Sequence, residues 1–169
     1  MSKKHNRHFR FTERFMNNVF LGLGSNVGKR EKNIETALDH LQSHPEITLI
    51  QISTQYETIA VSQYQQPNYL NSVAKIATFL TPMELLDITE SIEQTMGRAT
   101  KGMGDPRIID IDLLFYNDDI ISTDRLTIPH ALAHERLFVL NPMNDIAPDY
   151  LHPILNQTMS ELRADLDGY

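Results

Sequence analysis

The chain has 169 residues, of which 41% are apolar and 22% charged, and its formal net charge is −7. This length and composition are typical of a single folded globular domain. The absence of cysteine excludes a disulfide scaffold, a thiolate zinc site and a cysteine nucleophile. The acidic balance argues against non-specific nucleic-acid binding. The apolar runs are too short to predict a membrane span.

Residues 1–18, "MSKKHNRHFRFTERFMNN", are basic and contain no apolar stretch like that of a secretory signal. We expect them to form a flexible extension. Residues 19–169 show neither an internal repeat nor a linker, so we expect them to form one domain.

Strand and helix patterns alternate along the first half of the domain. "VFLGLGSN" at 19–26 predicts a strand that runs into a glycine-rich turn. Apolar residues recur every three or four positions over 29–44 and predict an amphipathic helix. Residues 47–58 and 69–80, which are rich in β-branched side chains, predict two further strands.

A second helix is predicted over 81–96, because Thr81 can cap it and Glu84 completes a capping box. The strand pattern of 105–116 follows. The resulting order, β-α-β-β-α-β, is that of the ferredoxin-like α+β fold, an antiparallel sheet with helices on one face. A short helix near 133–140 and a C-terminal helix that begins at Thr158 are predicted as additions to this core.

The glycine-rich segment "GLGSNVGKR" does not match the known phosphate loops. Five residues separate Gly22 from Gly28 where the P-loop has four, and Arg30 stands where a Ser or Thr would bind magnesium. The spacing of Gly22, Gly24 and Gly28 also differs from the dinucleotide-binding pattern. We therefore interpret the segment as a tight strand-to-helix turn, with glycines that permit a close packing contact.

The segment "DPRIIDIDLLFY" carries Asp110 and Asp112, which share one face of the predicted strand with Ile108 and Leu114. A solvated edge strand is one interpretation. A strand that opens into a cleft is the other, and there a magnesium ion would offset the repulsion between the carboxylates. The opposite face carries three apolar residues expected in the core, Ile109, Ile111 and Leu113.

Five basic residues surround this strand. Arg98 and Arg107 precede it, and Arg125, His130 and Arg136 follow it. Arginines that converge on magnesium-binding aspartates are typical of phosphoryl transfer, because the metal and the arginines both neutralise phosphate charge. Surface arginines and a structural histidine are the alternative.

On the strand at 69–80, Tyr69 and Asn71 share a face opposite Leu70. The amide of Asn71 offers both a donor and an acceptor, which suits the edge of a heterocycle. Bonding of Asn71 to the local backbone is an equally good interpretation.

Taken together, these motifs resemble one family, the 6-hydroxymethyl-7,8-dihydropterin pyrophosphokinases of folate biosynthesis. The resemblance covers residues 19–166 and rests on the following segments: "GLGSN", "YET", "QPNYLNSVAKI", "IEQTMGR", "PRIIDIDLLFY" and "RLTIPHALAHERLFVLNPMNDIAP". It implies a ferredoxin-like fold and the transfer of diphosphate from ATP to the pterin hydroxymethyl group, with release of AMP. It further implies a magnesium-dependent, cytoplasmic monomer without nucleic-acid or membrane partners.

The resemblance also implies roles for individual residues. Asp110 and Asp112 would bind two magnesium ions and, with Arg98 and Arg107, form the catalytic set. The ATP site would contain Glu93, Arg98, Arg107, Ile111, Leu113, Arg125, Thr127, His130 and Arg136. The pterin site would contain Asn26, Thr58, Val61, Tyr69, Asn71 and Phe138.

The chain departs from the family pattern beside these residues. The loop at 98–106 has no tryptophan, Thr100 stands where arginine is common, and Ile59 and Ala60 replace two prolines. These changes spare the aspartates, so we expect altered loop closure rather than lost activity. A paralogue that binds pterin or nucleotide without transfer is one alternative function, and a ferredoxin-like RNA-binding module is another.

Overall fold

The computed structural model describes residues 15–59, 66–97 and 106–167. Its elements are β1 (Asn17–Ser25), α1 (Arg30–Gln42), β2 (Ile47–Ile52), β3 (Tyr56–Thr58), β4 (Tyr69–Thr78), α2 (Pro82–Thr95), β5 (Asp110–Tyr116), β6 (Ile121–Ser122), β7 (Thr127–Ile128), a 3-10 helix (Ala133–Glu135), α3 (Leu137–Ile146) and α4 (Met159–Asp167). Within these residues, no helix is both long and apolar enough to cross a membrane.

The main sheet is antiparallel, with the strand order β2-β4-β1-β5. The short strand β3 pairs with β4 beyond the end of β2. β1 therefore lies between β4 and β5, and residues far apart in sequence face each other across it. Strands β6 and β7 form a separate two-stranded sheet.

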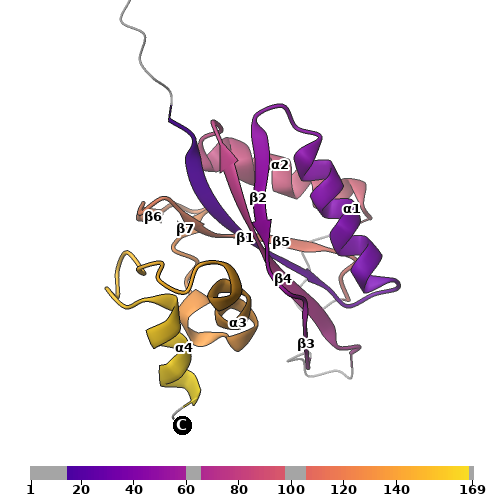
Figure 1. The fold of residues 1–169 in the computed structure, drawn as a ribbon. Coiled ribbons are helices and arrows are strands. Elements are labelled where there is room, and N and C mark those ends of the chain that lie inside the picture. The colour runs from indigo at the N-terminus through magenta and orange to yellow at the C-terminus, as the bar shows by residue number, and fades with distance from the viewer. Residues whose placement is uncertain (1–14, 60–65, 98–105, 168–169) are drawn as a thin grey trace, which may run out of the picture.

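Helices α1 and α2 cover one face of the sheet (Figure 1). The core there consists of apolar side chains from β1, both helices and β5, among them Val19, Leu21, Leu23, Ile34, Leu41, Leu85, Ile92, Ile111 and Leu113. The predicted capping box at the start of α2 is present, since Glu84 accepts from the Thr81 N–H at 2.8 Å and Thr81 accepts from the Glu84 N–H.

Helices α3 and α4 pack on the opposite face, where a second apolar cluster joins them to the sheet (Figure 1). The sheet contributes Phe20, Val73, Leu114 and Phe115 to this cluster. The prediction of helices on one face thus holds for α1 and α2, and the C-terminal helices form a third layer. They cover only part of this face. In the remaining part, residues of β1, β4 and β5 line a cavity.

The single strand predicted over 47–58 is divided into β2 and β3. Between the two pairings with β4, Ser53, Thr54 and Gln55 lie opposite Ser72 and Val73 alone, so one strand carries an extra residue. The Ser53 hydroxyl accepts from the Val73 N–H at 2.9 Å and maintains the connection across this irregularity. A one-residue mismatch of this kind interrupts a ladder and bends the strand.

The predicted strand at 105–116 begins at Asp110 rather than earlier. Its pairing with β1 shifts by one residue between Leu113 and Phe115, so Leu114 has no partner on β1. Leu114 and Phe115 both reach the α3 side as a result. The bulge ends the simple alternation of faces just beyond Asp112.

Candidate active site

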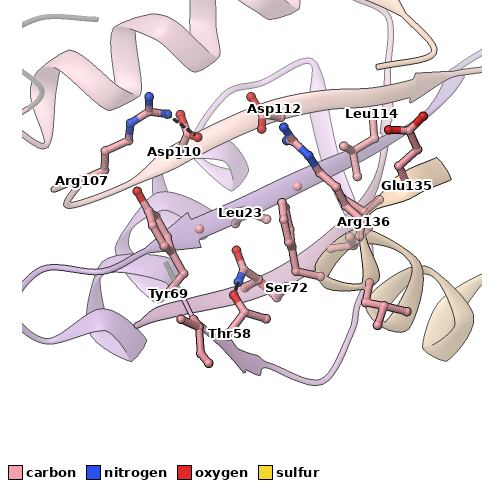
Figure 2. A pocket seen from close by; sticks show the side chains of 18 of the residues that line it. Leu23, Thr58, Tyr69, Ser72, Arg107, Asp110, Asp112, Leu114, Glu135 and Arg136 are labelled. Carbon is pink, nitrogen blue, oxygen red and sulfur yellow. Dashed lines mark hydrogen bonds and ion pairs between the residues drawn. The ribbon is translucent and has the colours of Figure 1, made fainter. Parts of the chain in front are cut away.

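A cavity of about 660 Å³ opens on the face of the sheet that α3 covers only in part. Figure 2 shows Asp110 and Asp112 projecting into it from β5, with Arg136 reaching toward Asp112 from the opposite side. Other residues that line it are Gly22, Gly24, Thr58, Tyr69, Asn71, Arg107 and Phe138. The cavity thus brings together polar residues from four separate stretches of the chain.

The floor of this cavity is the glycine-containing part of β1. Gly22 pairs with Asp112 and Gly24 pairs with Asp110. Because both glycines face the cavity without a side chain, the main chain of Leu23, whose own side chain is in the core on the helix side, also lines it. The carboxylates therefore stand beside a flat, open strip of sheet.

The two glycines differ in how closely they are packed. A Cβ atom at Gly24 would lie 3.0 Å from the Asn71 Oδ1, whereas one at Gly22 would meet the Leu114 side chain at 3.4 Å, an ordinary contact. The close-packing interpretation is therefore correct for Gly24. Their assignment to a strand-to-helix turn was wrong, because both lie within β1, and it is Gly28, with φ of 64°, that lies in the turn.

The two carboxylates have different surroundings. Arg107 donates to Asp110 with an Nη1–Oδ2 distance of 2.7 Å. Burial, followed by the charges of Asp110 and Glu93, raises the pKa of Asp112 to about 7, while Arg107 and Arg136 act in the opposite direction. A buried carboxylate beside other carboxylates is costly to ionise, and a bound cation removes that cost.

The donor set fits magnesium. Mg²⁺ binds one or two protein carboxylates and takes its other ligands from water and phosphate. Over the described ranges, no cluster of three or more His, Cys, Asp or Glu side chains offers a complete protein cage. Asp110 and Asp112 could therefore hold an ion that stays open to a phosphate ligand.

A second cavity, of about 390 Å³, lies next to the first. Arg107, Asp110 and Asp112 line both cavities, so the two carboxylates stand where the cavities meet. The second cavity also contains Glu90, Glu93, Ile111, Leu113, Arg125, Thr127 and His130. Every described residue that the resemblance assigns to ATP lines one cavity or the other, with Arg136 in the first.

Several of these residues are already engaged. The buried Glu93 accepts from the Ile111 N–H at 2.7 Å, which connects α2 to the outer edge of β5. Arg125 forms ion pairs with Asp87 and Glu90 at 2.7 and 3.0 Å. These contacts connect Ile111 and Arg125, which line the second cavity, to α2.

His130 lies beside the carboxylates in the second cavity. Burial lowers the pKa of His130, the charge of Arg136 adds to this, and Asp110 opposes it. A lowered pKa keeps more of the imidazole neutral near pH 7.

The residues assigned to the pterin lie mainly in the first cavity. The Asn71 Nδ2 donates to the Thr58 Oγ1 at 2.7 Å, which orients the amide. Tyr69 lines the cavity from β4 and Phe138 from α3, where the Arg136 guanidinium lies 5.3 Å from the Phe138 ring centre. Two aromatic rings on separate elements are suited to a planar heterocycle.

Asn26 lines neither described cavity. Its Oδ1 accepts from the Arg107 N–H at 2.7 Å, and its Nδ2 donates to the Gln66 side chain and the Pro67 carbonyl at 3.2 and 3.3 Å. Asn26 thereby joins the segment before β5 to the segment before β4. A direct contact of Asn26 with the pterin stays a prediction.

Comparison with known proteins agrees with the family suggested by the sequence motifs. The family model described as 7,8-dihydro-6-hydroxymethylpterin-pyrophosphokinase (HPPK) matches residues 20–148. The chain belongs to the HPPK family. The resemblance drawn from the sequence motifs is therefore confirmed.

Two bacterial HPPK relatives match over most of their length. The chain is 40% identical to the 2-amino-4-hydroxy-6-hydroxymethyldihydropteridine pyrophosphokinase of Methylorubrum extorquens over 152 residues. This alignment covers 90% of this chain and 95% of the relative. The enzyme of the same name from Bacillus subtilis is 40% identical over 132 residues, 78% of this chain and 79% of the relative.

Other HPPK relatives are much longer. The chain is 40% identical to the folic acid synthesis protein fol1 of Schizosaccharomyces pombe over 85% of its own length but spans 20% of that protein. A crystal structure of wild-type Plasmodium falciparum HPPK-DHPS has a TM-score of 0.73 at 19% identity, covering 91% of this chain and 45% of the other. At that identity the similarity shows the fold.

Two of the HPPK site residues inferred from the motifs, Val61 and Arg98, lie outside the described residues, as does most of the tryptophan-free loop. The sequence motifs did not point to Gly22 or Gly24 as cavity residues. A usable signal was present, because glycines two apart in a strand leave a gap on one face.

Proposed function

We propose that this chain transfers the diphosphate group of ATP to the hydroxymethyl oxygen of 6-hydroxymethyl-7,8-dihydropterin and releases AMP, a step in folate biosynthesis. The observation that carries the proposal is the position of Asp110 and Asp112 at the junction of two cavities. The first cavity would take the pterin and the second ATP, so the hydroxyl and the triphosphate would meet at the carboxylates. HPPK family membership supports this assignment.

The reaction is a direct displacement. The pterin hydroxyl attacks the β-phosphorus, the bond from that phosphorus to the oxygen bridging the α- and β-phosphates breaks, and the hydroxyl proton is released. Two magnesium ions held by Asp110 and Asp112 would supply charge neutralisation and acidify the hydroxyl. No covalent enzyme intermediate is required, so the side chains act by positioning and by electrostatics.

Arginines would neutralise the phosphates. Arg107 lines both cavities beside Asp110, and Arg136 faces Asp112 across the first cavity (Figure 2). Guanidinium groups bind phosphate oxygens through paired, charge-assisted hydrogen bonds. By the family pattern, Arg98 would join them. Residues of the second cavity, Glu93, Arg125, Thr127 and His130, would bind the rest of the nucleotide.

The pterin would lie between Tyr69 and Phe138, with its polar edge toward Asn71. Ring stacking fixes the plane of the heterocycle, and the oriented amide fixes its rotation within that plane. The hydrogen bond between Asn71 and Thr58 supports the role of the amide because it restrains the Asn71 side chain. Asn26 and Val61 would complete this side of the site.

We also infer properties of the whole molecule. The strand order β2-β4-β1-β5 supports a ferredoxin-like core, to which α3 and α4 are C-terminal additions. Residues 19–169 would form a single domain, and Asn17 and Asn18, which we expected in the N-terminal extension, also belong to it because, as part of β1, they pair with Thr78 and Ala77 of β4. We infer that the protein is a cytoplasmic monomer that acts on small molecules and does not bind nucleic acid.

The test is incubation with ATP, magnesium and 6-hydroxymethyl-7,8-dihydropterin, followed by separation of the products. We expect AMP and the pterin diphosphate in equal amounts. Release of AMP should require the pterin, formation of the pterin diphosphate should require ATP, and both should require magnesium. Release of ADP, or AMP without a pterin product, would contradict the proposal.

A further inference from the structure

The carboxylate of Asp145, in the last turn of α3, accepts hydrogen bonds from the segment that forms one wall of the first cavity. The Tyr56 hydroxyl donates to its Oδ1 and Oδ2 at 2.9 and 3.1 Å, and the Thr54 N–H donates to Oδ2 at 3.1 Å. Both partners belong to the segment that leads into and forms β3. Asp145 itself lines neither described cavity.

β3 needs such a support. It has three residues, and within the described part of the chain it pairs only with β4, at the outer end of the sheet. A strand this short has few ladder hydrogen bonds and is not stable without further packing. Hydrogen bonds to an ionised carboxylate are stronger than those between neutral groups, so these two donors, the Tyr56 hydroxyl shared between both oxygens and the Thr54 N–H, restrain the position of β3.

The position of β3 decides the orientation of Asn71. Tyr56 pairs directly with Asn71 in the ladder, and Thr58 accepts from the Asn71 Nδ2 at 2.7 Å. On its other side the Asn71 Oδ1 is packed over Gly24. The amide is therefore held between β3 and β1, and a displacement of β3 would release one of its two restraints.

Asp145 also connects the two sides of the cavity. Helix α3, which carries Asp145 near its end, carries Phe138 near its start. Phe138 lines the cavity opposite the sheet, and Thr58 lines it from β3. A bond between Asp145 and β3 thus sets the spacing between the helix that bears one aromatic wall and the strand that orients the amide.

We propose that Asp145 is a positioning residue for the pterin: through Tyr56 and Thr54 it holds β3 so that Thr58 and Asn71 present a fixed hydrogen-bonding edge to the cavity. This inference rests on the proposed function. Asp145 acts through β3 and does not touch the substrate, so its loss reduces pterin binding and leaves ATP binding unchanged.

The test compares Michaelis constants for the two substrates in the full chain. Asp145→Ala removes the acceptor of both donors, and we expect the KM for the pterin to rise about tenfold with the KM for ATP changed less than about twofold. Tyr56→Phe keeps the ring and the Thr54 bond, and we expect a rise of about threefold. Asp145→Asn, which retains a carbonyl acceptor, should recover part of the loss.

Asp167→Ala is the matched control. It removes another exposed carboxylate from the C-terminal helices, one that pairs with Arg163 at 2.9 Å. The pterin affinity should not change in this variant. Equal increases in both Michaelis constants for Asp145→Ala, or no increase in either, would overturn the inference.

A binding measurement keeps the inference separate from the proposed function. The dissociation constant of 6-hydroxymethyl-7,8-dihydropterin is measured with magnesium and α,β-methylene-ATP, in which the scissile bond is replaced. A wild-type protein that binds both ligands but releases no AMP would overturn the proposed function alone. Equal pterin affinity of wild type and Asp145→Ala would overturn the role of Asp145 alone.

Discussion

Strand β5 presents two contrasting faces. Toward α1 and α2, Ile111 and Leu113 are each 4% exposed and belong to the main apolar core. Toward the cavities, Asp110 and Asp112 lie where the two cavities meet. The same stretch of chain thus contributes apolar side chains to the core on one face and carboxylates to the cavities on the other. Because successive residues alternate between these faces, each can be changed separately.

The largest expected effect is on the cavity face. Asp112→Ala should lower the rate of AMP release at least about a thousandfold, because it removes a carboxylate that would hold the catalytic metal. Its unfolding free energy should be equal to or higher than that of the wild type, since a repelled, buried charge is lost. Asp118→Ala, in the exposed turn after β5, is the control. A variant with near-normal AMP release would contradict the metal assignment.

Ile109→Ala tests the other face, since Ile109 is 1% exposed, belongs to the main apolar core and lines neither described cavity. It should lower the unfolding free energy by about 2–4 kcal/mol in urea titrations, because it leaves a cavity in the core. At temperatures where the variant remains folded, both Michaelis constants should match those of the wild type. A selective loss of substrate affinity would mean that the two faces are not separable.

The glycines of β1 provide a smaller test within the cavity face. Gly24→Ala places a methyl group 3.0 Å from the Asn71 Oδ1 and should raise the KM for the pterin about tenfold. Gly22→Ala meets only the Leu114 side chain at ordinary contact distance among the described atoms, and it should raise that constant less than Gly24→Ala does. Equal effects of the two substitutions would contradict the assignment of Asn71 to the pterin edge.

The smallest expected effect is a change of stability with pH at His152, in the segment between α3 and α4. His152 packs edge-on against Phe115 at 5.5 Å and has its Nδ1 within 3.3 Å of two backbone N–H groups. Burial lowers the pKa of His152 from its usual 6.5, and the charge of His134 adds to this. The unfolded chain therefore binds this proton more readily, and the stability contributed by neutral His152 is present above pH 6.5 and lost as the pH falls below it.

Urea titrations at pH 7.5 and pH 5.5 measure this effect. We expect His152→Asn, which keeps an acceptor near the Nδ1 position, to lose less unfolding free energy on acidification than the wild type. Parallel pH profiles for the two proteins would show that His152 does not contribute.

The sequence alone determined the order of the main helices and strands through Tyr116 and the division of β5 into an apolar and an acidic face. Periodicity and capping signals were sufficient for α1 and α2, because these helices are local structures with one apolar side. The alternation of aspartate with apolar residues was sufficient to predict a core face and a polar face. The motifs around Asp110 and Asp112 were also sufficient for the family, which the family comparison confirmed.

Other features were decided by tertiary structure. The extra residue that separates β2 from β3, and the bulge at Leu114, depend on pairing with strands distant in the sequence. The spacing of Gly22 and Gly24 indicates a gap on one face of a strand, but that this gap is the floor of a cavity is decided by β4 and β5 on either side of β1. The role of Asp145 likewise appears only when α3 is placed beside β3. A sequence specifies which side chains share a face, whereas long-range packing decides what that face meets.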